Sequence, residues 1–329
     1  MTMNKVEQSW YKPISLINIV LLPLSALFWL VSTVRRLLFR VGIKSSYKAS
    51  VPVMIVGNIG IGGNGKTPFV LWLVPYLQSL GLKVGVISRG YGAKPPHTPY
   101  QVTNESTAEL AGDEPLLIYK RLGCDVVIGG DRKASIEYLI SHNEPDIIVS
   151  DDGLQHYQLD RDIEICIVDN ERRFGNGFLL PAGPLRETPK RLKSVDLTVF
   201  NGSIKEDGYS LNTTGIYSVK TGERVTSFEP RGIAVSAIGN PSRFEKSLAA
   251  NGVTITQSKH FVDHHMFTAQ DFEIYNKSNV FMTEKDAVKC QSFAKDNWYF
   301  LRVDAVPSEG LVSKLHNLLD KKGIITHGV

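Results

Sequence analysis

The segment Ile55–Val70 reads IVGNIGIGGNGKTPFV and carries a dense glycine cluster followed by lysine and threonine. Residues Gly60–Thr67 fit the pattern GxxxxGK[ST], which forms a phosphate-binding loop when a strand precedes it and a helix follows. The apolar run Val51–Val56 predicts a buried strand, and Phe69–Leu80 has apolar residues at helical spacing. Both flanking elements are therefore in place, and the segment predicts a nucleotide-binding α/β fold.

The residue types of this loop suit the binding of a nucleotide with Mg²⁺. Glycines let the backbone N–H groups turn toward phosphate oxygens, and the helix N-terminus adds partial positive charge. We expect Lys66 to reach the β- and γ-phosphates and the Thr67 hydroxyl to ligate Mg²⁺. The other residues expected to line the nucleotide are Gly60, Ile61, Gly62, Gly63, Asn64 and Gly65.

Four more short apolar runs follow, separated by segments of helical pattern. They predict strands of a doubly wound, mostly parallel sheet at Lys83–Ser88, Asp125–Ile128, Asp146–Ser150 and Ile163–Val168. Ligands of such sheets gather at the carboxyl ends of the strands.

One of these strands ends in two carboxylates, Asp151 and Asp152. An apolar strand that delivers a carboxylate to Mg²⁺ is typical of a Walker B segment. Either aspartate can be the Mg²⁺ ligand on this evidence, since the sequence does not distinguish them.

The charge distribution argues against a nucleic-acid-binding body. The 329 residues include 37 basic and 33 acidic ones, but residues 1–50 hold seven basic and one acidic side chain, which leaves 30 and 32. The basic excess therefore belongs to the N-terminal segment. The three cysteines lie far apart without a CxxC spacing, so neither a zinc site nor a disulfide framework is predicted.

A long apolar segment, Ile14–Val34, lies close to the N-terminus. No charge interrupts its 21 residues, which as a helix would span about 30 Å, the thickness of the bilayer core. Arg35, Arg36 and Arg40 follow it directly, and this bias places the C-terminal body in the cytoplasm. We expect a membrane anchor. A helix embedded in one leaflet and a buried core helix are the alternatives.

The pattern divides the chain into an anchor with a basic collar (1–48), a core with the phosphate loop (49–200), a linker (201–224) and a smaller α/β lobe (225–329). The linker is rich in Gly, Ser, Thr and Asn. The smaller lobe is expected to contain strands at Ile233–Ile238, Val253–Thr256, Val280–Thr283 and Trp298–Val303.

The chain lacks the NKxD guanine-reading motif of switch GTPases and the extra early lysine of partition ATPases. The interpretation that remains is phosphoryl transfer to a small acceptor. The alternative is a membrane-tethered ATPase that acts as a positioning or assembly factor. Transfer needs a base near the hydroxyl and cations around the γ-phosphate. Asp113 is a candidate for these roles, although it could serve only as a helix cap. The other candidates are Arg186, Glu187 and the cluster Asp263–His265.

Seven motifs occur in an order and spacing that resemble one family, the tetraacyldisaccharide 4'-kinases (lipid A 4'-kinases) of Gram-negative bacteria. The resemblance covers nearly the whole chain. The motifs are GGNGKTP (62–68), SRGYG (88–92), GDEP (112–115), DDGLQH (151–156), LLPAGPLRE (179–187), DHH (263–265) and TEKDAVK (283–289).

The resemblance implies a two-lobed kinase on the cytoplasmic face of the inner membrane. Such an enzyme uses ATP and Mg²⁺ to phosphorylate the 4'-hydroxyl of a tetraacylated glucosamine disaccharide 1-phosphate, a lipid substrate. By motif, Asp113 is similar to the family's catalytic carboxylate and His264 to the histidine that pairs with it. The resemblance also implies a phosphate contact for Arg186 and a Mg²⁺-side carboxylate in Glu187.

Overall fold

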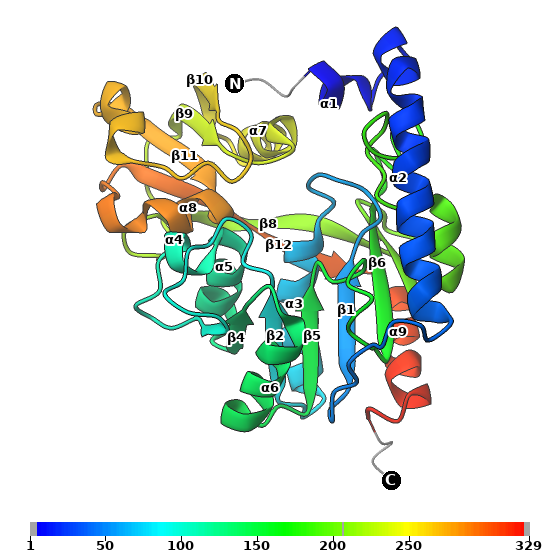
Figure 1. Cartoon of the computed structure of the whole chain (residues 1–329). Coiled ribbons are helices and arrows are strands. Elements are labelled where there is room, and N and C mark those ends of the chain that lie inside the picture. The colour runs from blue at the N-terminus through cyan, green and yellow to red at the C-terminus, as the bar shows by residue number, and fades with distance from the viewer. Residues whose placement is uncertain (1–4, 206, 326–329) are drawn as a thin grey trace.

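The computed structural model describes residues 5–205 and 207–325, which form a 12-stranded sheet flanked by helices (Figure 1). Neighbouring strands run parallel except in the pairs β12–β8 and β3–β4. The prediction of a mostly parallel α/β fold with one apolar N-terminal helix is therefore confirmed. The strand order is β10-β9-β11-β12-β8-β7-β6-β1-β5-β2-β4-β3.

Five strands in the first half of the sheet follow the predicted strands to within a few residues, because they are apolar runs buried on both faces. Tyr100–Gln101 and Leu197–Asn201 are strands that were not predicted, and both are only partly buried. The strands of this half are β1 (Val53–Gly57), β2 (Val84–Ser88), β3 (Tyr100–Gln101), β4 (Asp125–Ile128), β5 (Ile147–Asp151), β6 (Ile163–Asp169) and β7 (Leu197–Asn201). Its helices are α3 (Lys66–Ser79), α4 (Ala108–Ala111), α5 (Asp113–Leu122), α6 (Arg132–Asn143) and the 3-10 helix η1 (Pro189–Ser194).

Helix α3 carries apolar residues around most of its circumference, so it is a core helix. Phe69, Leu73 and Leu77 are completely buried. The C-terminal helix α9 (Glu309–Lys321) adds Leu311, Leu315 and Leu319 to the same core cluster. Each such burial contributes about 1.5–3 kcal/mol. The end of the chain therefore packs on the half that contains the glycine loop.

The second half of the sheet has its own aromatic-rich core, which includes Trp298 and Phe272. Its strands are β9 (Arg231–Ser236), β10 (Thr254–His260), β11 (Asn279–Thr283) and β12 (Trp298–Pro307). Its helices are α7 (Pro241–Ala250), α8 (Glu284–Cys290) and the 3-10 helices η2 (Ala269–Tyr275) and η3 (Gln291–Phe293).

A long strand, β8 (Gly208–Ser218), joins the two halves. It pairs with β7 on one side and with β12 on the other, so the sheet continues through the stretch predicted as the linker. Its polar composition resembles that of a loop because most of its residues are only partly buried. The division of the chain into domains stays a prediction.

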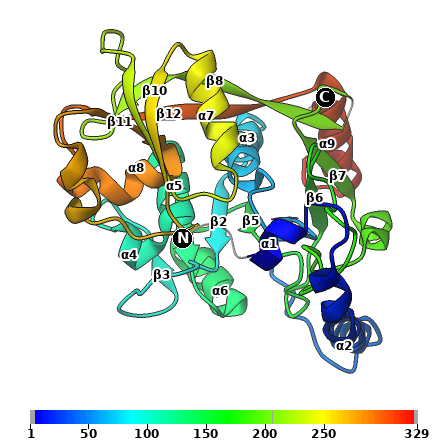
Figure 2. The ribbon, with the colours of Figure 1, turned by 90° about the horizontal axis from the view of Figure 1, so that it is seen from above.

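After a short helix α1 (Lys5–Ser9), helix α2 (Leu16–Arg40) runs along one flank of the body (Figures 1 and 2). It is the one helix of residues 5–205 and 207–325 that is long and apolar enough to cross a membrane. The buried side chains of Asn18 and Ser25 face the body, where they donate hydrogen bonds to the carbonyls of Ala182 (3.0 Å) and Leu179 (2.9 Å). Most of the residues that it exposes before Arg35 are apolar, and they include Leu16, Val20, Leu24, Leu27, Trp29, Leu30, Val31 and Val34.

Candidate active site

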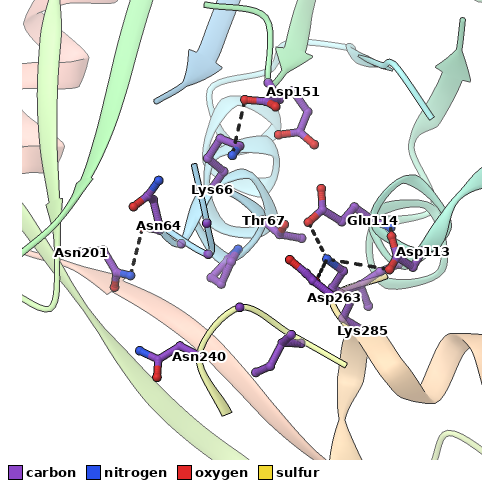
Figure 3. Close-up of a pocket in the computed structure, with 18 of the residues that line it drawn as sticks. Asn64, Lys66, Thr67, Asp113, Glu114, Asp151, Asn201, Asn240, Asp263 and Lys285 are labelled. Atoms are coloured by element: carbon purple, nitrogen blue, oxygen red, sulfur yellow. Dashed lines mark hydrogen bonds and ion pairs between the residues drawn. The ribbon is translucent and has the colours of Figure 1, made fainter. Parts of the chain in front are cut away.

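A cavity of about 1440 Å³ opens between the two halves of the sheet (Figure 3). The glycine loop and the end of β5 line it on one side, and residues 238–244 and 283–285 line it from the second half. Pockets for a single drug-sized ligand measure about 300–1,000 Å³. The cavity is therefore large enough for a nucleotide together with part of a second substrate.

Two side chains, one from β7 and one from β8, hold the glycine loop through hydrogen bonds. Tyr209 donates to the Gly65 carbonyl (2.6 Å), and the Asn201 amide donates to the Asn64 carbonyl (3.1 Å). Gly65 has φ 94°, and a Cβ atom there would lie 2.3 Å from the Tyr209 hydroxyl. Only glycine fits this position. The loop thus presents Lys66 at the first turn of α3 to the cavity.

The other predicted loop residues differ in whether they line the cavity. Gly60 forms an isolated bridge with Leu185 and does not line the cavity, so it supports the loop from outside. The residues of the glycine loop that line the cavity are Ile61, Gly62, Gly63, Asn64, Gly65, Lys66 and Thr67.

Asp152 follows β5 and is paired with two cations. Its carboxylate lies 3.4 Å from the Lys66 ammonium and 3.3 Å from the Arg186 guanidinium. Burial raises the pKa of Asp152, but the charges of Lys66 and Arg186 outweigh burial and hold that pKa below its usual value. Asp152 also has φ 51°, a left-handed conformation that non-glycine residues rarely adopt outside functional sites.

Asp151 precedes Asp152, but its carboxylate has a different environment. Its side chain is buried, and within the described part of the chain its Oδ1 atom has no hydrogen-bond partner. Burial, followed by the negative charges of Glu114 and Asp152, raises the pKa of Asp151 to about 7. A cation at this carboxylate would supply the missing partner, so the site fits Mg²⁺.

No three acidic, histidine or cysteine side chains of the described residues are grouped closely enough to hold a metal by themselves. Mg²⁺ in kinases takes one or two protein ligands and completes its shell with phosphate oxygens and water. Thr67 and one aspartate of the pair are compatible with that arrangement.

The structure does not bring Glu187 to the other predicted site residues. It is absent from the cavity lining, and its carboxylate accepts hydrogen bonds from the Tyr157 hydroxyl and from Gln155 (3.0 Å). Arg191 adds an ion pair at 3.7 Å. These donors occupy the carboxylate, whereas the preceding residue, Arg186, reaches the cavity.

Asp113 and His264 meet across the cavity. Asp113 begins α5 after Gly112, whose φ of 84° breaks the chain direction between α4 and α5. His264 Nδ1 lies 3.1 Å from both carboxylate oxygens of Asp113. Burial raises the pKa of Asp113, but the His264 hydrogen bond and the nearby Lys285 and Lys289 outweigh it and bring that pKa to about 2.

Two further residues of this region, Glu114 and Lys285, received no role from the sequence. Together with Asp263 of the candidate cluster, they lie close to Asp113 (Figure 3). Lys285 lies within the motif TEKDAVK, and this motif was the available signal. The contacts of Lys285 depend on folding, because Glu114 and Lys285 are separated by 171 positions.

Comparison with known proteins gives a consistent result. The family model for Tetraacyldisaccharide-1-P 4'-kinase matches residues 17–320. The chain is 53% identical to the tetraacyldisaccharide 4'-kinase of Pseudoalteromonas translucida, over 98% of this chain and 99% of that one. It is 50% identical to the enzyme of that name from Haemophilus influenzae, over 95% and 96% of the two chains.

A solved structure agrees with the sequence relatives. The crystal structure of "apo" form LpxK from Aquifex aeolicus in complex with ATP superposes with a TM-score of 0.77 at 28% identity. The match covers 93% of this chain and 99% of that one. The chain therefore belongs to the tetraacyldisaccharide-1-P 4'-kinase family.

Proposed function

We propose that this chain transfers the γ-phosphate of ATP to the 4'-hydroxyl of tetraacyldisaccharide 1-phosphate. The product is the lipid that carries phosphates at both positions 1 and 4'. The observation that carries the proposal is the shared cavity, which is lined by the phosphate loop and by the Asp113–His264 pair. A donor site and a hydroxyl-binding site in one cavity suit direct transfer between two bound substrates.

The donor side consists of the glycine loop and its charged neighbours. Lys66 and Arg186 both point toward Asp152 and would turn to the β- and γ-phosphates when ATP binds. Thr67 and one of Asp151 and Asp152 would hold Mg²⁺, and the unpartnered oxygen of Asp151 favours that residue. The bound Mg²⁺ would neutralise charge that develops on the transferring phosphoryl group.

The acceptor side consists of Asp113 and the groups around it. An ionised carboxylate can orient a hydroxyl and accept its proton late in a loose, metaphosphate-like transition state. His264 orients Asp113 from the second half of the sheet. The low pKa of Asp113 keeps it ionised throughout the physiological range.

Helix α2 supports a membrane location for this reaction. It is fixed to the body near both ends, through Asn18 and through Arg36, which donates to Ser194 (3.1 Å). About 27 Å of helix separates these contacts. A helix that crossed the bilayer would pull the attached body into it, so α2 would lie in one leaflet. Arg35, Arg36 and Arg40 near the end of α2 would attract anionic headgroups, which supports a location at the cytoplasmic face of the inner membrane.

The test is the fate of the γ-phosphate. Purified protein, γ-labelled ATP and tetraacyldisaccharide 1-phosphate in mixed micelles should give labelled lipid. An acceptor whose 4'-hydroxyl is blocked should give none. Label found only in free phosphate would refute the proposal and favour a membrane-tethered ATPase.

A further inference from the structure

Lys285 contacts all three carboxylates around the acceptor side of the cavity. Its ammonium lies 3.1 Å from Glu114, 3.5 Å from Asp263 and 3.8 Å from Asp113 (Figure 3). The three acidic residues come from α5 and from the loop after β10, whereas Lys285 comes from α8. One side chain thus connects both halves of the sheet at the cavity.

Lys285 also determines which ring nitrogen of His264 can carry a proton. Its ammonium lies 3.4 Å from His264 Nε2, and an ammonium group can only donate. In the neutral imidazole, Nε2 therefore accepts from Lys285, and the proton sits on Nδ1. Nδ1 is the nitrogen 3.1 Å from the Asp113 carboxylate, so this tautomer donates to Asp113.

A second lysine of α8 has a different environment. Lys289 lies 2.7 Å from Asp286 and 3.7 Å from Asp113, and its side chain is fully buried. Lys289 does not line the cavity, whereas Lys285 does and is 16% exposed. Lys289 is thus enclosed in the protein, and Lys285 lies where its removal opens space at the reacting groups.

We propose that Lys285 is a positioning residue for phosphoryl transfer, which fixes the His264 tautomer and ties α8 to α5 across the cavity. It acts on Asp113 through His264 and through direct attraction. This inference rests on the proposed function. Transfer then requires more than a correctly bound ATP, because the carboxylate on the acceptor side must also be oriented.

The kinetic test compares Lys285→Met and Lys285→Arg with the wild type. Lys285→Met should lower kcat by about 100-fold, the cost of a misplaced reacting group, with the KM values for ATP and lipid unchanged. Lys285→Arg, which restores a cation, should recover part of kcat. Lys220→Met is the matched control, because Lys220 pairs with Asp296 at 2.8 Å outside the cavity. The control should keep wild-type kcat.

A spectroscopic test measures the tautomer directly. Burial lowers the pKa of His264, but the hydrogen bond to Asp113 outweighs burial and raises that pKa, so the spectra are recorded at a pH above it. In protein with ¹⁵N-labelled histidine, the wild type should then show His264 protonated at Nδ1 and unprotonated at Nε2. Lys285→Met should show a mixture of tautomers. If Lys285→Met is too unstable to purify, Lys285→Gln replaces it in both tests.

Two results would overturn the inference. One is wild-type kcat and an unchanged His264 tautomer in a folded Lys285 variant. The other is a raised KM with unchanged kcat, which would make Lys285 a substrate-binding cation. If the wild type itself phosphorylates no lipid, the proposed function fails instead, and the two failures are therefore distinguishable.

Discussion

Replacing Asp113 by asparagine should remove a contribution to stability that depends on pH. The pKa of Asp113 is lowered from its ordinary value of 3.8 to about 2. A group with a depressed pKa stabilises the folded state above its unfolded-state pKa, and that stabilisation is lost as pH falls through the folded-state pKa. A shift of almost two units corresponds to about 2 kcal/mol at 1.36 kcal/mol per unit.

The contribution should be complete above about pH 5 and absent below about pH 1. Between pH 7 and pH 3 the free energy of unfolding of the wild type should therefore fall by about 1 kcal/mol more than that of Asp113→Asn. Urea unfolding in detergent, followed by tryptophan fluorescence, to which the buried Trp298 contributes, measures this difference.

A His264→Ala variant is the control, since it keeps the carboxylate and removes its hydrogen-bond partner. Its stability should depend on pH less steeply than that of the wild type in the same range. A gap between the wild type and Asp113→Asn that is the same at pH 7 and pH 3 would refute the reasoning.

Three other substitutions test separate parts of the site. Lys66→Met should lower kcat at least about 100-fold in the lipid phosphorylation assay, because a cation facing the γ-phosphate is lost. Gly65→Ala should abolish ATP binding in titration calorimetry, because its Cβ would lie 2.3 Å from the Tyr209 hydroxyl. Ser25→Ala should cost about 1–3 kcal/mol in thermal unfolding, because the buried Ala182 N–H, which donates to Ser25 at 3.0 Å, loses its acceptor.

The parts of the fold that were predictable from sequence have a local signal. Strand β4 (Asp125–Ile128) has the predicted bounds, because four apolar-rich residues lie between clear helix and turn signals. The glycine loop was identified from residue types alone, since its geometry requires them. Strand β8 was missed because it is partly exposed and polar, and its pairing with β12 depends on residues far along the chain.

The parts of the site that were not predictable depend on contacts between distant residues. The family resemblance implied a Mg²⁺-side role for Glu187, but Tyr157 and Gln155 hold the Glu187 carboxylate outside the cavity lining. Apart from its place in the motif TEKDAVK, Lys285 has no local feature that distinguishes it from other lysines. Its place beside Glu114 arises only when α8 packs against α5.

The polar residues of α2 also have a tertiary explanation. Asn18 and Ser25 lower the hydrophobicity of an otherwise apolar helix, which left its relation to the membrane open. Both side chains are buried against the body, so the exposed face remains apolar. A composition average over the helix cannot separate these two faces.

The central claim is that ATP binding and acceptor activation reside in separate groups that meet in one cavity. Single-turnover transfer by Asp113→Asn, measured together with its ATP dissociation constant, tests this most directly. We expect an ATP dissociation constant equal to that of the wild type and a transfer rate lower by about 10²–10⁴-fold. Lipid phosphorylation by Asp113→Asn at the wild-type rate would contradict it.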